Sequence, residues 1–216
     1  MDHKKYLSIV AACESDLKKY GDNYLGVGWT KRQEDAYTRY QVMLEVIKRN
    51  TRGAHDADGK VSLLDFGCGA SHLYEYILRQ QIADVDYTGL DLSEDFIQLS
   101  RSKFPFLNYY HVDILEDRIE LPFFDYIVIN GVFTSKCDLS FEEMLTFFQN
   151  VVSKLFHKAR AGVAFNVMSK QVDWERDDLF HLPFDTLADF LTKKVSKNFV
   201  FRSDYGLYEY TTYVYQ

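Results

Sequence analysis

The chain has 216 residues, of which 25 are Lys or Arg and 32 are Asp or Glu, so its formal net charge is −7. A hydrophobic content of 47% and a charged content of 26% are typical of one folded domain and exclude disordered and fibrous classes. The acidic balance argues against a protein that grips duplex nucleic acid, which needs clustered Lys and Arg.

The cysteines and the apolar runs predict a cytoplasmic protein without a membrane segment. Cys13, Cys68 and Cys137 have no CxxC spacing, so neither a disulfide framework nor a zinc site is expected. No apolar run approaches the roughly 20 residues of a membrane span. A short signal sequence after Lys5 is an alternative interpretation of the N-terminus. The spacing of three and four favours an amphipathic helix instead, with a stripe formed by Tyr6, Ile9, Val10, Cys13, Leu17 and Tyr20.

The first fifty residues predict a helical N-terminal cap, residues 1–50. Helices are expected over 4–19 and 31–48, joined by a loop rich in glycine and aromatic residues at 21–29. The polar segment 51–60 is the best candidate linker in the chain. It separates the cap from a second unit, residues 61–216.

This second unit alternates short strands with helices, which predicts an α/β fold with a mostly parallel sheet. Helices are expected over 71–81, from Ser93, from the capping box that begins at Ser140, and over 184–194. A turn at 204–207 predicts that the last two strands form an antiparallel hairpin. The expected strands are 61–66, 87–90, 108–112, 124–129, 162–168, 199–202 and 208–215.

A glycine loop, LLDFGCGAS, follows the first of these strands. Gly67 and Gly69 let the backbone approach a ligand and turn into a helix N-terminus. A dinucleotide fingerprint needs a third glycine where this chain has His72, which argues against a nicotinamide-dependent oxidoreductase. No Walker pattern is present.

Three acidic residues stand at or near the carboxyl ends of successive strands. Asp65 lies in the glycine-loop segment, Asp91 ends the second strand and Asp113 follows the third. In open α/β sheets this edge binds ligands, and an acid at the position of Asp91 reaches ribose hydroxyls. A turn or helix cap is the alternative role for each of them.

These segments resemble the class I S-adenosylmethionine-dependent methyltransferases. LLDFGCGAS, YTGLDLSEDFI and YYHVDILE resemble the first three motifs of that family, and FFDYIVINGVF resembles its fourth strand and the turn after it. The resemblance implies a Rossmann-like seven-stranded sheet that ends in an antiparallel hairpin. Ser71 stands where the family often has a third glycine, and as a serine it is expected to cap the following helix.

The resemblance also implies a cofactor site for S-adenosylmethionine, with S-adenosylhomocysteine as the product. In that site the glycine loop passes beneath the methionyl part, Asp65 orients the amino group, and Asp91 holds the ribose. Asp113 and Ile114 flank the adenine, and Asn130 and Gly131 lie beside the sulfonium. Arg39, from the second cap helix, is a candidate partner for the cofactor carboxylate, with a solvated helix charge as the alternative. The full predicted set is Asp65, Gly67, Cys68, Gly69, Asp91, Leu92, Asp113, Ile114, Asn130, Gly131 and Arg39.

The acceptor is expected to be a small polar metabolite, methylated on oxygen. Asn130-Gly-Val-Phe133 lacks the prolines of enzymes that methylate base amines. The segments FNVMSKQVDWERDDLFHLPFDTLADFL and DYGLYEYTTYVY resemble bacterial methyltransferases of surface-glycan and metabolite clusters, which implies a sugar, a nucleotide sugar or a glycan precursor. The alternative is a regulatory or scaffold protein that binds S-adenosylmethionine without turnover.

Candidate residues for the acceptor side are aromatic rings and histidines. His181 is the first candidate for a general base and His72 the second, because an imidazole titrates near neutral pH. Tyr24, Trp29 and Trp174 are expected near the acceptor, and the alternative for the first two is packing of the cap. No metal site is expected, and the partner is expected to be the small-molecule acceptor, with the protein a monomer or homodimer.

Overall fold

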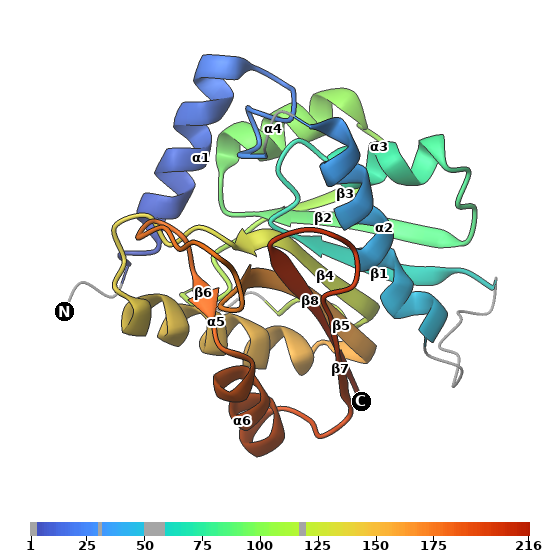
Figure 1. Ribbon diagram of the computed structural model, residues 1–216. Helices are drawn as coiled ribbons and strands as arrows, with labels where there is room; N and C mark the ends of the chain where they lie inside the picture. The colour runs from blue at the N-terminus through green and yellow to red at the C-terminus, as the bar shows by residue number, and fades with distance from the viewer. Residues whose placement is uncertain (1–3, 30–31, 50–58, 117–119) are drawn as a thin grey trace.

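The computed structural model describes residues 4–29, 32–49, 59–116 and 120–216. Its helices and strands alternate along the chain after an all-helical start (Figure 1). The helices are α1 (Leu7–Tyr20), α2 (Gln33–Arg49), α3 (His72–Arg79), α4 (Glu94–Lys103), α5 (Phe141–Phe156) and α6 (Phe184–Lys194). The strands are β1 (Val61–Phe66), β2 (Val85–Asp91), β3 (Asn108–His111), β4 (Phe124–Phe133), β5 (Ala159–Ser169), β6 (His181–Leu182), β7 (Phe199–Arg202) and β8 (Glu209–Tyr215).

One sheet runs through the molecule in the order β3-β2-β1-β4-β5-β8-β7. The five strands from β3 to β5 are parallel to one another, whereas β8 lies antiparallel to both β5 and β7. This path confirms the predicted mostly parallel, seven-stranded sheet with its C-terminal hairpin. An eighth strand, the two-residue β6, pairs with the end of β5 where the sequence predicted only a loop.

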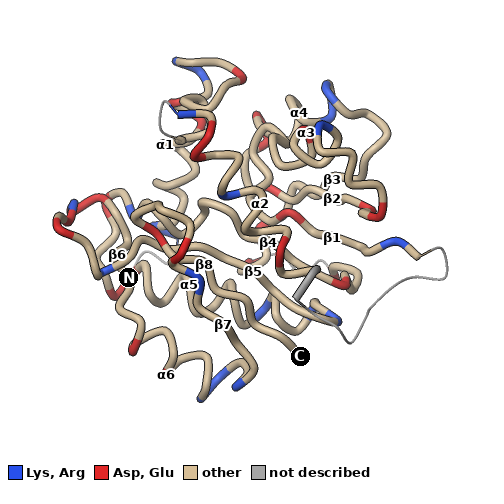
Figure 2. The backbone as a smooth tube through the Cα atoms, turned by 45° about the vertical axis from the view of Figure 1, so that its right-hand side comes forward, with Lys and Arg blue, Asp and Glu red and all other residues tan. Residues whose placement is uncertain are grey.

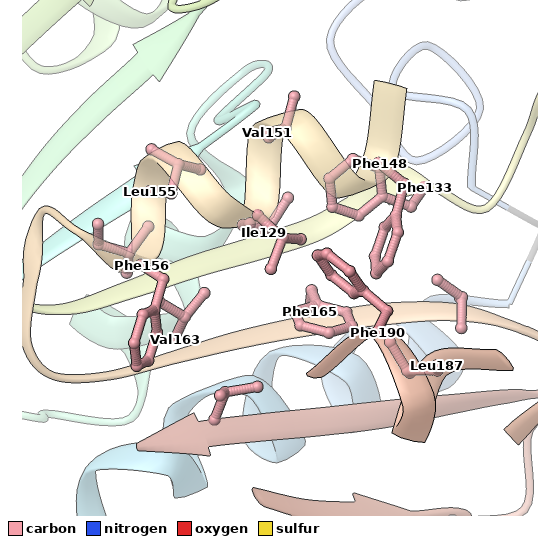
Figure 3. Close-up of a cluster of buried hydrophobic side chains, with 14 of the residues drawn as sticks. Ile129, Phe133, Phe148, Val151, Leu155, Phe156, Val163, Phe165, Leu187 and Phe190 are labelled. Atoms are coloured by element: carbon pink, nitrogen blue, oxygen red, sulfur yellow. The ribbon is translucent and has the colours of Figure 1, made fainter. Parts of the chain in front are cut away.

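Helices cover both faces of the sheet, which makes three layers (Figure 1). On one face α2, α3 and α4 contribute Met43, Leu73 and Ile97 to a cluster with the inward residues of β1, β2 and β4. On the other face α5 and α6 pack on β4 and β5 (Figure 3). This second cluster contains many rings, including the mutually packed Phe133, Phe148 and Phe165, so a large part of the aromatic content fills the core.

The two N-terminal helices take different places. α2 is part of the layer described above, and its Ala36, Met43 and Val46 are fully buried. α1 has no buried residue and lies beside the carboxyl ends of the strands (Figure 1). Residues 50–58, most of the predicted linker 51–60, lie outside the described residues, so the predicted division into units 1–50 and 61–216 stays a prediction. None of the helices that the structure describes is long and apolar enough to cross a membrane.

Strand β4 is longer than predicted because it continues through a bulge. The sequence predicted its end at Ile129, but pairing with β5 resumes at Phe133 after a register shift. Gly131, inside the shifted segment, has φ 83°, a left-handed conformation that glycine adopts without strain. Bulges of this kind re-aim side chains next to binding sites, and this one lies at the carboxyl edge of the sheet.

Candidate active site

A cavity of about 210 Å³ opens at the carboxyl edge of the parallel strands. Its walls come from the glycine loop after β1, the ends of β2 and β4, the segment after β3, α1 and the loop 21–29. The cavity brings together every predicted cofactor residue except Arg39, namely Asp65, Gly67, Cys68, Gly69, Asp91, Leu92, Asp113, Ile114, Asn130 and Gly131.

The glycine loop has the tight backbone that its sequence predicts. Gly67 has φ 74°, and a Cβ placed there would lie 2.3 Å from Cγ2 of Val132, so both conformation and space require glycine. Ser71 stands at the N-cap position of α3, but the predicted capping bond is absent. Ser71 has φ 58°, and its hydroxyl instead contacts Ser100 Oγ at 2.8 Å. A left-handed conformation is one that glycine adopts without strain and that other residues adopt rarely.

Two carboxylates flank the loop, Asp65 fully buried and Asp91 partly buried. Asp65 is 3% exposed and accepts a hydrogen bond from the Tyr87 hydroxyl at 2.7 Å. Burial raises the pKa of Asp65 to about 7, against the effect of the Tyr87 bond. Asp91 accepts bonds from the backbone N–H groups of Gly69 and Ser93 at 2.8 and 2.9 Å. Burial also raises the pKa of Asp91, and these backbone donors oppose the rise.

The third carboxylate, Asp113, is joined to Tyr6, the residue just before helix α1. Its Oδ2 accepts a hydrogen bond from the Tyr6 hydroxyl at 2.7 Å, and its Oδ1 accepts one from the backbone of Leu115 at 3.0 Å. The Tyr6 ring stacks on Phe147 with centroids 5.0 Å apart.

The sequence did not predict that residues of α1 line the cavity. The apolar stripe of the helix predicts that these residues share one face, but the spacing does not indicate which part of the protein that face covers. They are Ile9, Val10 and Cys13, joined by Tyr6 just before the helix.

A buried polar chain fixes the bulge of β4. The Gly131 N–H donates to Asn166 Oδ1 at 2.7 Å, and Asn166 Nδ2 donates to Glu209 Oε1 at 2.9 Å. The second oxygen of Glu209 accepts from Arg39 Nε at 2.8 Å. Arg39 therefore binds a carboxylate of the protein itself, and it does not line the cavity. Beside Gly131, the side-chain oxygen of Asn130 is buried without a hydrogen-bond partner.

Trp29 forms the cavity wall next to this bulge. A Cβ placed on Gly131 would lie 2.5 Å from Trp29 Cη2, so the indole lies directly against the glycine backbone. The Arg39 guanidinium lies on the indole, 4.6 Å from the centroid of the ring, which is a cation–π distance. Trp29 thus connects the cavity wall to the buried polar chain.

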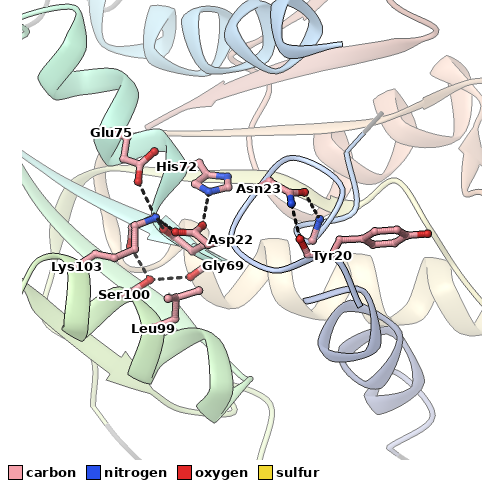
Figure 4. Close-up of polar contacts among 12 residues, drawn as sticks. Tyr20, Asp22, Asn23, Gly69, His72, Glu75, Leu99, Ser100 and Lys103 are labelled. Atoms are coloured by element: carbon pink, nitrogen blue, oxygen red, sulfur yellow. Dashed lines mark hydrogen bonds and ion pairs between the residues drawn. The ribbon is translucent and has the colours of Figure 1, made fainter. Parts of the chain in front are cut away.

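The loop 21–29 is fastened to α3 and α4 by ion pairs (Figure 4). Asp22 lies 2.7 Å from His72 Nε2 and 2.8 Å from Lys103 Nζ, and Lys103 also lies 2.6 Å from Glu75. Burial alone raises the pKa of Asp22, but hydrogen bonds from Lys103 and His72 lower it overall. Asp22, His72 and Glu75 place possible metal ligands within 4.8 Å of one another. Because the Lys103 ammonium already supplies positive charge there, these residues hold the loop 21–29 against α3 and α4.

The other predicted acceptor-side residues lie away from the cavity. His181 is buried in β6, where its Nδ1 lies 2.7 Å from the Ser169 carbonyl and its Nε2 accepts from the Arg176 N–H at 3.4 Å. Trp174 packs against His181 and Tyr208. Tyr24 packs against Tyr37 and His72. Of the predicted acceptor-side residues, Trp29 and His72 line the cavity, whereas His181, Tyr24 and Trp174 do not.

Comparison with known proteins assigns the family. Residues 64–160 match the model of the family described as "Methyltransferase domain". A Mycobacterium tuberculosis protein named "Putative methyltransferase Rv1506c" is 30% identical over 156 residues, which are 71% of this chain and 92% of the relative. The chain therefore belongs to the methyltransferase family of class I, whose members use S-adenosylmethionine.

Solved structures share the fold over nearly the whole chain. The magnesium protoporphyrin IX methyltransferase ChlM of Synechocystis PCC 6803, crystallised with S-adenosylmethionine, has a TM-score of 0.64 at 15% identity, covering 98% of this chain and 97% of that one. The plantazolicin methyltransferase BpumL, in complex with a pentazolic desmethylPZN analogue and S-adenosylhomocysteine, has a TM-score of 0.61 at 14% identity, covering 99% of this chain and 94% of that one. The predictions of fold class, enzyme class and cofactor are thus confirmed.

Proposed function

We propose that the chain transfers a methyl group from S-adenosylmethionine to an oxygen atom of a small polar metabolite, such as a sugar, a nucleotide sugar or a surface-glycan precursor. The observation that carries the proposal is the convergence of ten separately predicted residues on one cavity. These residues come from four strand ends far apart in the sequence. If these residues only capped turns and helices, they would not need to line the same cavity.

The chemistry of the cavity fits the cofactor group by group. The Asp65 carboxylate suits the ammonium group, and Asp91, held by two backbone N–H groups, presents its remaining lone pairs to ribose hydroxyls. Leu92 and Ile114 offer apolar contact for adenine next to Asp113. Bound S-adenosylmethionine supplies an electrophilic methyl group on its sulfonium. The role of this chain is then to hold the donor, orient the acceptor and exclude water, and alignment alone can supply about 7–11 kcal/mol.

The acceptor end of the cavity is proposed to lie between Trp29, Asn130 and Gly131. Val27 from the same loop and Ile9 and Val10 from α1 add apolar wall, which favours exclusion of water. Asn130 presents an unpartnered amide oxygen that can accept a hydrogen bond from a hydroxyl. None of the described residues that line the cavity is Lys or Arg. An uncharged sugar hydroxyl suits this wall better than a phosphate does, because three carboxylates already surround the site.

The partners follow from charge and fold. We infer a cytoplasmic protein, a monomer or homodimer, whose partner is the small-molecule acceptor and neither a nucleic acid nor a membrane. The net charge of −7 supports this, as does the spread of Lys and Arg over separate elements in Figure 2. A nucleic-acid surface gathers such residues in one stripe. The proposed general-base role of His181 would need a rearrangement that frees an imidazole nitrogen and brings it to the cavity.

The test combines binding with turnover. Calorimetry should detect micromolar binding of S-adenosylmethionine and S-adenosylhomocysteine, and labelled methyl should pass to a component of a bacterial metabolite extract. Asp91→Ala should abolish both, whereas Asp86→Ala, which removes an exposed carboxylate of the same strand, should leave both intact. Absence of binding would refute the proposal.

A second candidate, a regulatory or scaffold protein that binds S-adenosylmethionine without turnover, draws support from the distance of His181 from the cavity. Binding without transfer to any component of the extract would favour it. Steady turnover that Asp91→Ala abolishes would exclude it.

A further inference from the structure

Glu209 is a buried carboxylate that has no part yet in the proposed transfer. It begins β8 and is 2% exposed, and it does not line the cavity. Its Oε2 accepts a hydrogen bond from Arg39 Nε at 2.8 Å, and its Oε1 accepts one from Asn166 Nδ2 at 2.9 Å. A buried ion pair often adds no stability over apolar side chains, so stability alone does not explain these contacts.

The contact through Asn166 leads to the bulge of β4. On the two sides of the bulge, β4 pairs with Phe165 and with Val167 of β5. Asn166, which is fully buried, therefore lies opposite the three residues 130–132. Its side-chain oxygen accepts a hydrogen bond from the Gly131 N–H at 2.7 Å. Because the register of backbone pairing is interrupted at a bulge, this side-chain bond is what holds Gly131 to β5.

The contact through Arg39 leads to the same glycine by way of Trp29. The guanidinium carbon of Arg39 lies 4.6 Å from the centroid of the indole ring, and the indole edge lies directly against Gly131. Arg39 Nη1 is buried without a hydrogen-bond partner. The buried charge therefore depends on the contacts that the guanidinium does make, with Glu209 and with the indole face. The bond to Glu209 keeps the guanidinium over the ring.

We propose that Glu209 is a positioning residue for methyl transfer, which acts by holding Asn166 and Arg39 at the same time. Through these two side chains, one carboxylate fixes both Gly131 and Trp29, the walls of the proposed acceptor end. Its charge matters because both neighbours are donors, and a carboxylate offers each of them an acceptor oxygen, whereas an amide offers only one. The inference rests on the proposed function and adds to it a residue outside the cavity.

Glu209→Gln tests the role of the carboxylate with little change of shape. Transfer of labelled methyl to a component of the metabolite extract should fall about 10- to 100-fold, because the acceptor end loses its fixed geometry. The Kd of S-adenosylhomocysteine, measured by calorimetry, should stay within about 2-fold, since Glu209 does not line the cavity. Thr212→Val, which removes a buried hydroxyl without a partner from the same strand, is the matched control and should change neither value.

An exchange of carboxylate and amide provides a rescue. Asn166→Asp alone places two carboxylates against each other and should also impair transfer. In the double variant Asn166→Asp/Glu209→Gln, the new carboxylate accepts from the Gly131 N–H and from the new amide, whose oxygen accepts from Arg39. Every hydrogen bond and the net charge are restored, so transfer should return to within about 3-fold of the wild type.

Trp29 reports its own position without any acceptor. The chain has 2 tryptophans, so in a Trp174→Phe background the indole fluorescence comes from Trp29. Acrylamide quenching should rise about 2-fold in Glu209→Gln, because the indole is no longer held by the guanidinium, and the double variant should reverse the rise. Arg39→Lys keeps the charge beside Glu209 but loses the flat group over the ring. It should show the same rise and carries the test if Glu209→Gln does not fold.

Three results would overturn the proposal. Equal losses of S-adenosylhomocysteine affinity and of transfer in Glu209→Gln would mean that the carboxylate only supports the fold. A double variant as impaired as the single ones would show that these hydrogen bonds do not carry the effect. Unchanged quenching of Trp29 in Arg39→Lys would remove the connection to the loop 21–29. Wild-type protein that binds no S-adenosylhomocysteine would instead refute the proposed function itself, whereas a wrong role for Glu209 leaves wild-type binding intact.

Discussion

The Asp65 carboxyl group changes between its protonated and ionised forms near neutral pH. Its carboxylate is buried and its pKa is raised to about 7, so in the cofactor-free protein it is mostly protonated below that pH. An ammonium group needs the ionised form. The same burial that destabilises a free carboxylate makes its pairing with a cation strong.

Cofactor affinity should consequently depend on pH. From pH 8 to pH 6 the ionised fraction of Asp65 falls about 10-fold if its pKa is near 7, and binding of S-adenosylhomocysteine should weaken by about the same factor. Asp65→Asn should bind more weakly at pH 8 and show a flat profile between these pH values. Calorimetry at pH 6, 7 and 8 checks this. A wild-type profile as flat as that of the variant would contradict the role of Asp65.

The stability of the cofactor-free protein should show the opposite trend with pH. The folded pKa of Asp65 lies above its ordinary value of 3.8, so the folded state binds the proton more tightly than the unfolded chain does. That contribution is complete below pH 3.8 and is lost as the pH rises through 7. Relative to Asp65→Asn, the wild type should lose about 2–4 kcal/mol of unfolding free energy between pH 5 and pH 8. Urea unfolding measures it, and parallel pH profiles would contradict it.

Single residues also show where sequence reasoning reached its limit. The acids at positions 65, 91 and 113 could be placed because strand ends of a parallel sheet meet at one edge. The partner of Arg39 could not, because Glu209 lies 170 residues away and no local pattern joins them. Ser71 was assigned to the correct N-cap position, yet its φ of 58° turns the hydroxyl away from the helix, and backbone conformation is not visible in a one-letter code.

At the scale of elements, the regular pieces were predictable and the irregular ones were not. β1, β7 and α6 have the predicted bounds, because each is an apolar or amphipathic run with polar residues or a break at its ends. β6 has only two residues, too few for any periodicity. β4 contains Gly131, and in the sequence this glycine predicts the end of the strand. Only the pairing with β5 shows that the strand continues after it.

The loop 21–29 should matter more to the acceptor than to the cofactor. Trp29 lies against Gly131 at the proposed acceptor end, so Trp29→Leu should lower kcat/KM for the acceptor at least about 10-fold, because alignment and water exclusion are lost. Its effect on the Kd of S-adenosylhomocysteine should stay within about 3-fold. Calorimetry and steady-state kinetics give the two numbers, with Trp174→Leu, outside the cavity, as control. Equal losses in both would argue against this assignment.

Helix α1 should control how fast the product leaves. It has no buried residue and is attached through contacts such as the Tyr6–Asp113 bond. Tyr6→Phe removes that bond and keeps the stacking on Phe147, so S-adenosylhomocysteine should dissociate about 5-fold faster, the equivalent of about 1 kcal/mol. Stopped-flow fluorescence measures the rate. Tyr20→Phe, at the far end of the helix, should leave it unchanged, and an unaltered rate in Tyr6→Phe would contradict the role of α1.

For the molecule as a whole, cofactor binding should raise thermal stability. The cavity joins α1, the loop 21–29 and four strand ends, so a ligand there stabilises the folded chain and not the unfolded one. At 100 times its Kd, S-adenosylhomocysteine should add about 2.7 kcal/mol, or about 5–11 °C in Tm for a domain of this size. Differential scanning calorimetry should show this shift in wild type and Asp86→Ala. A comparable shift in Asp91→Ala would place the ligand elsewhere.

The buried chain from Arg39 through Glu209 and Asn166 to Gly131 has a consequence for biosynthesis. The glycine loop and the three acids leave the ribosome early, but Glu209 belongs to β8 and emerges only after nearly all of the chain. Until then Asn166 and Arg39 lack the carboxylate that joins them. A truncated chain that ends before β8 can therefore contain all the acidic residues of the cofactor site and still leave the side chains that contact the bulge and Trp29 without their common partner.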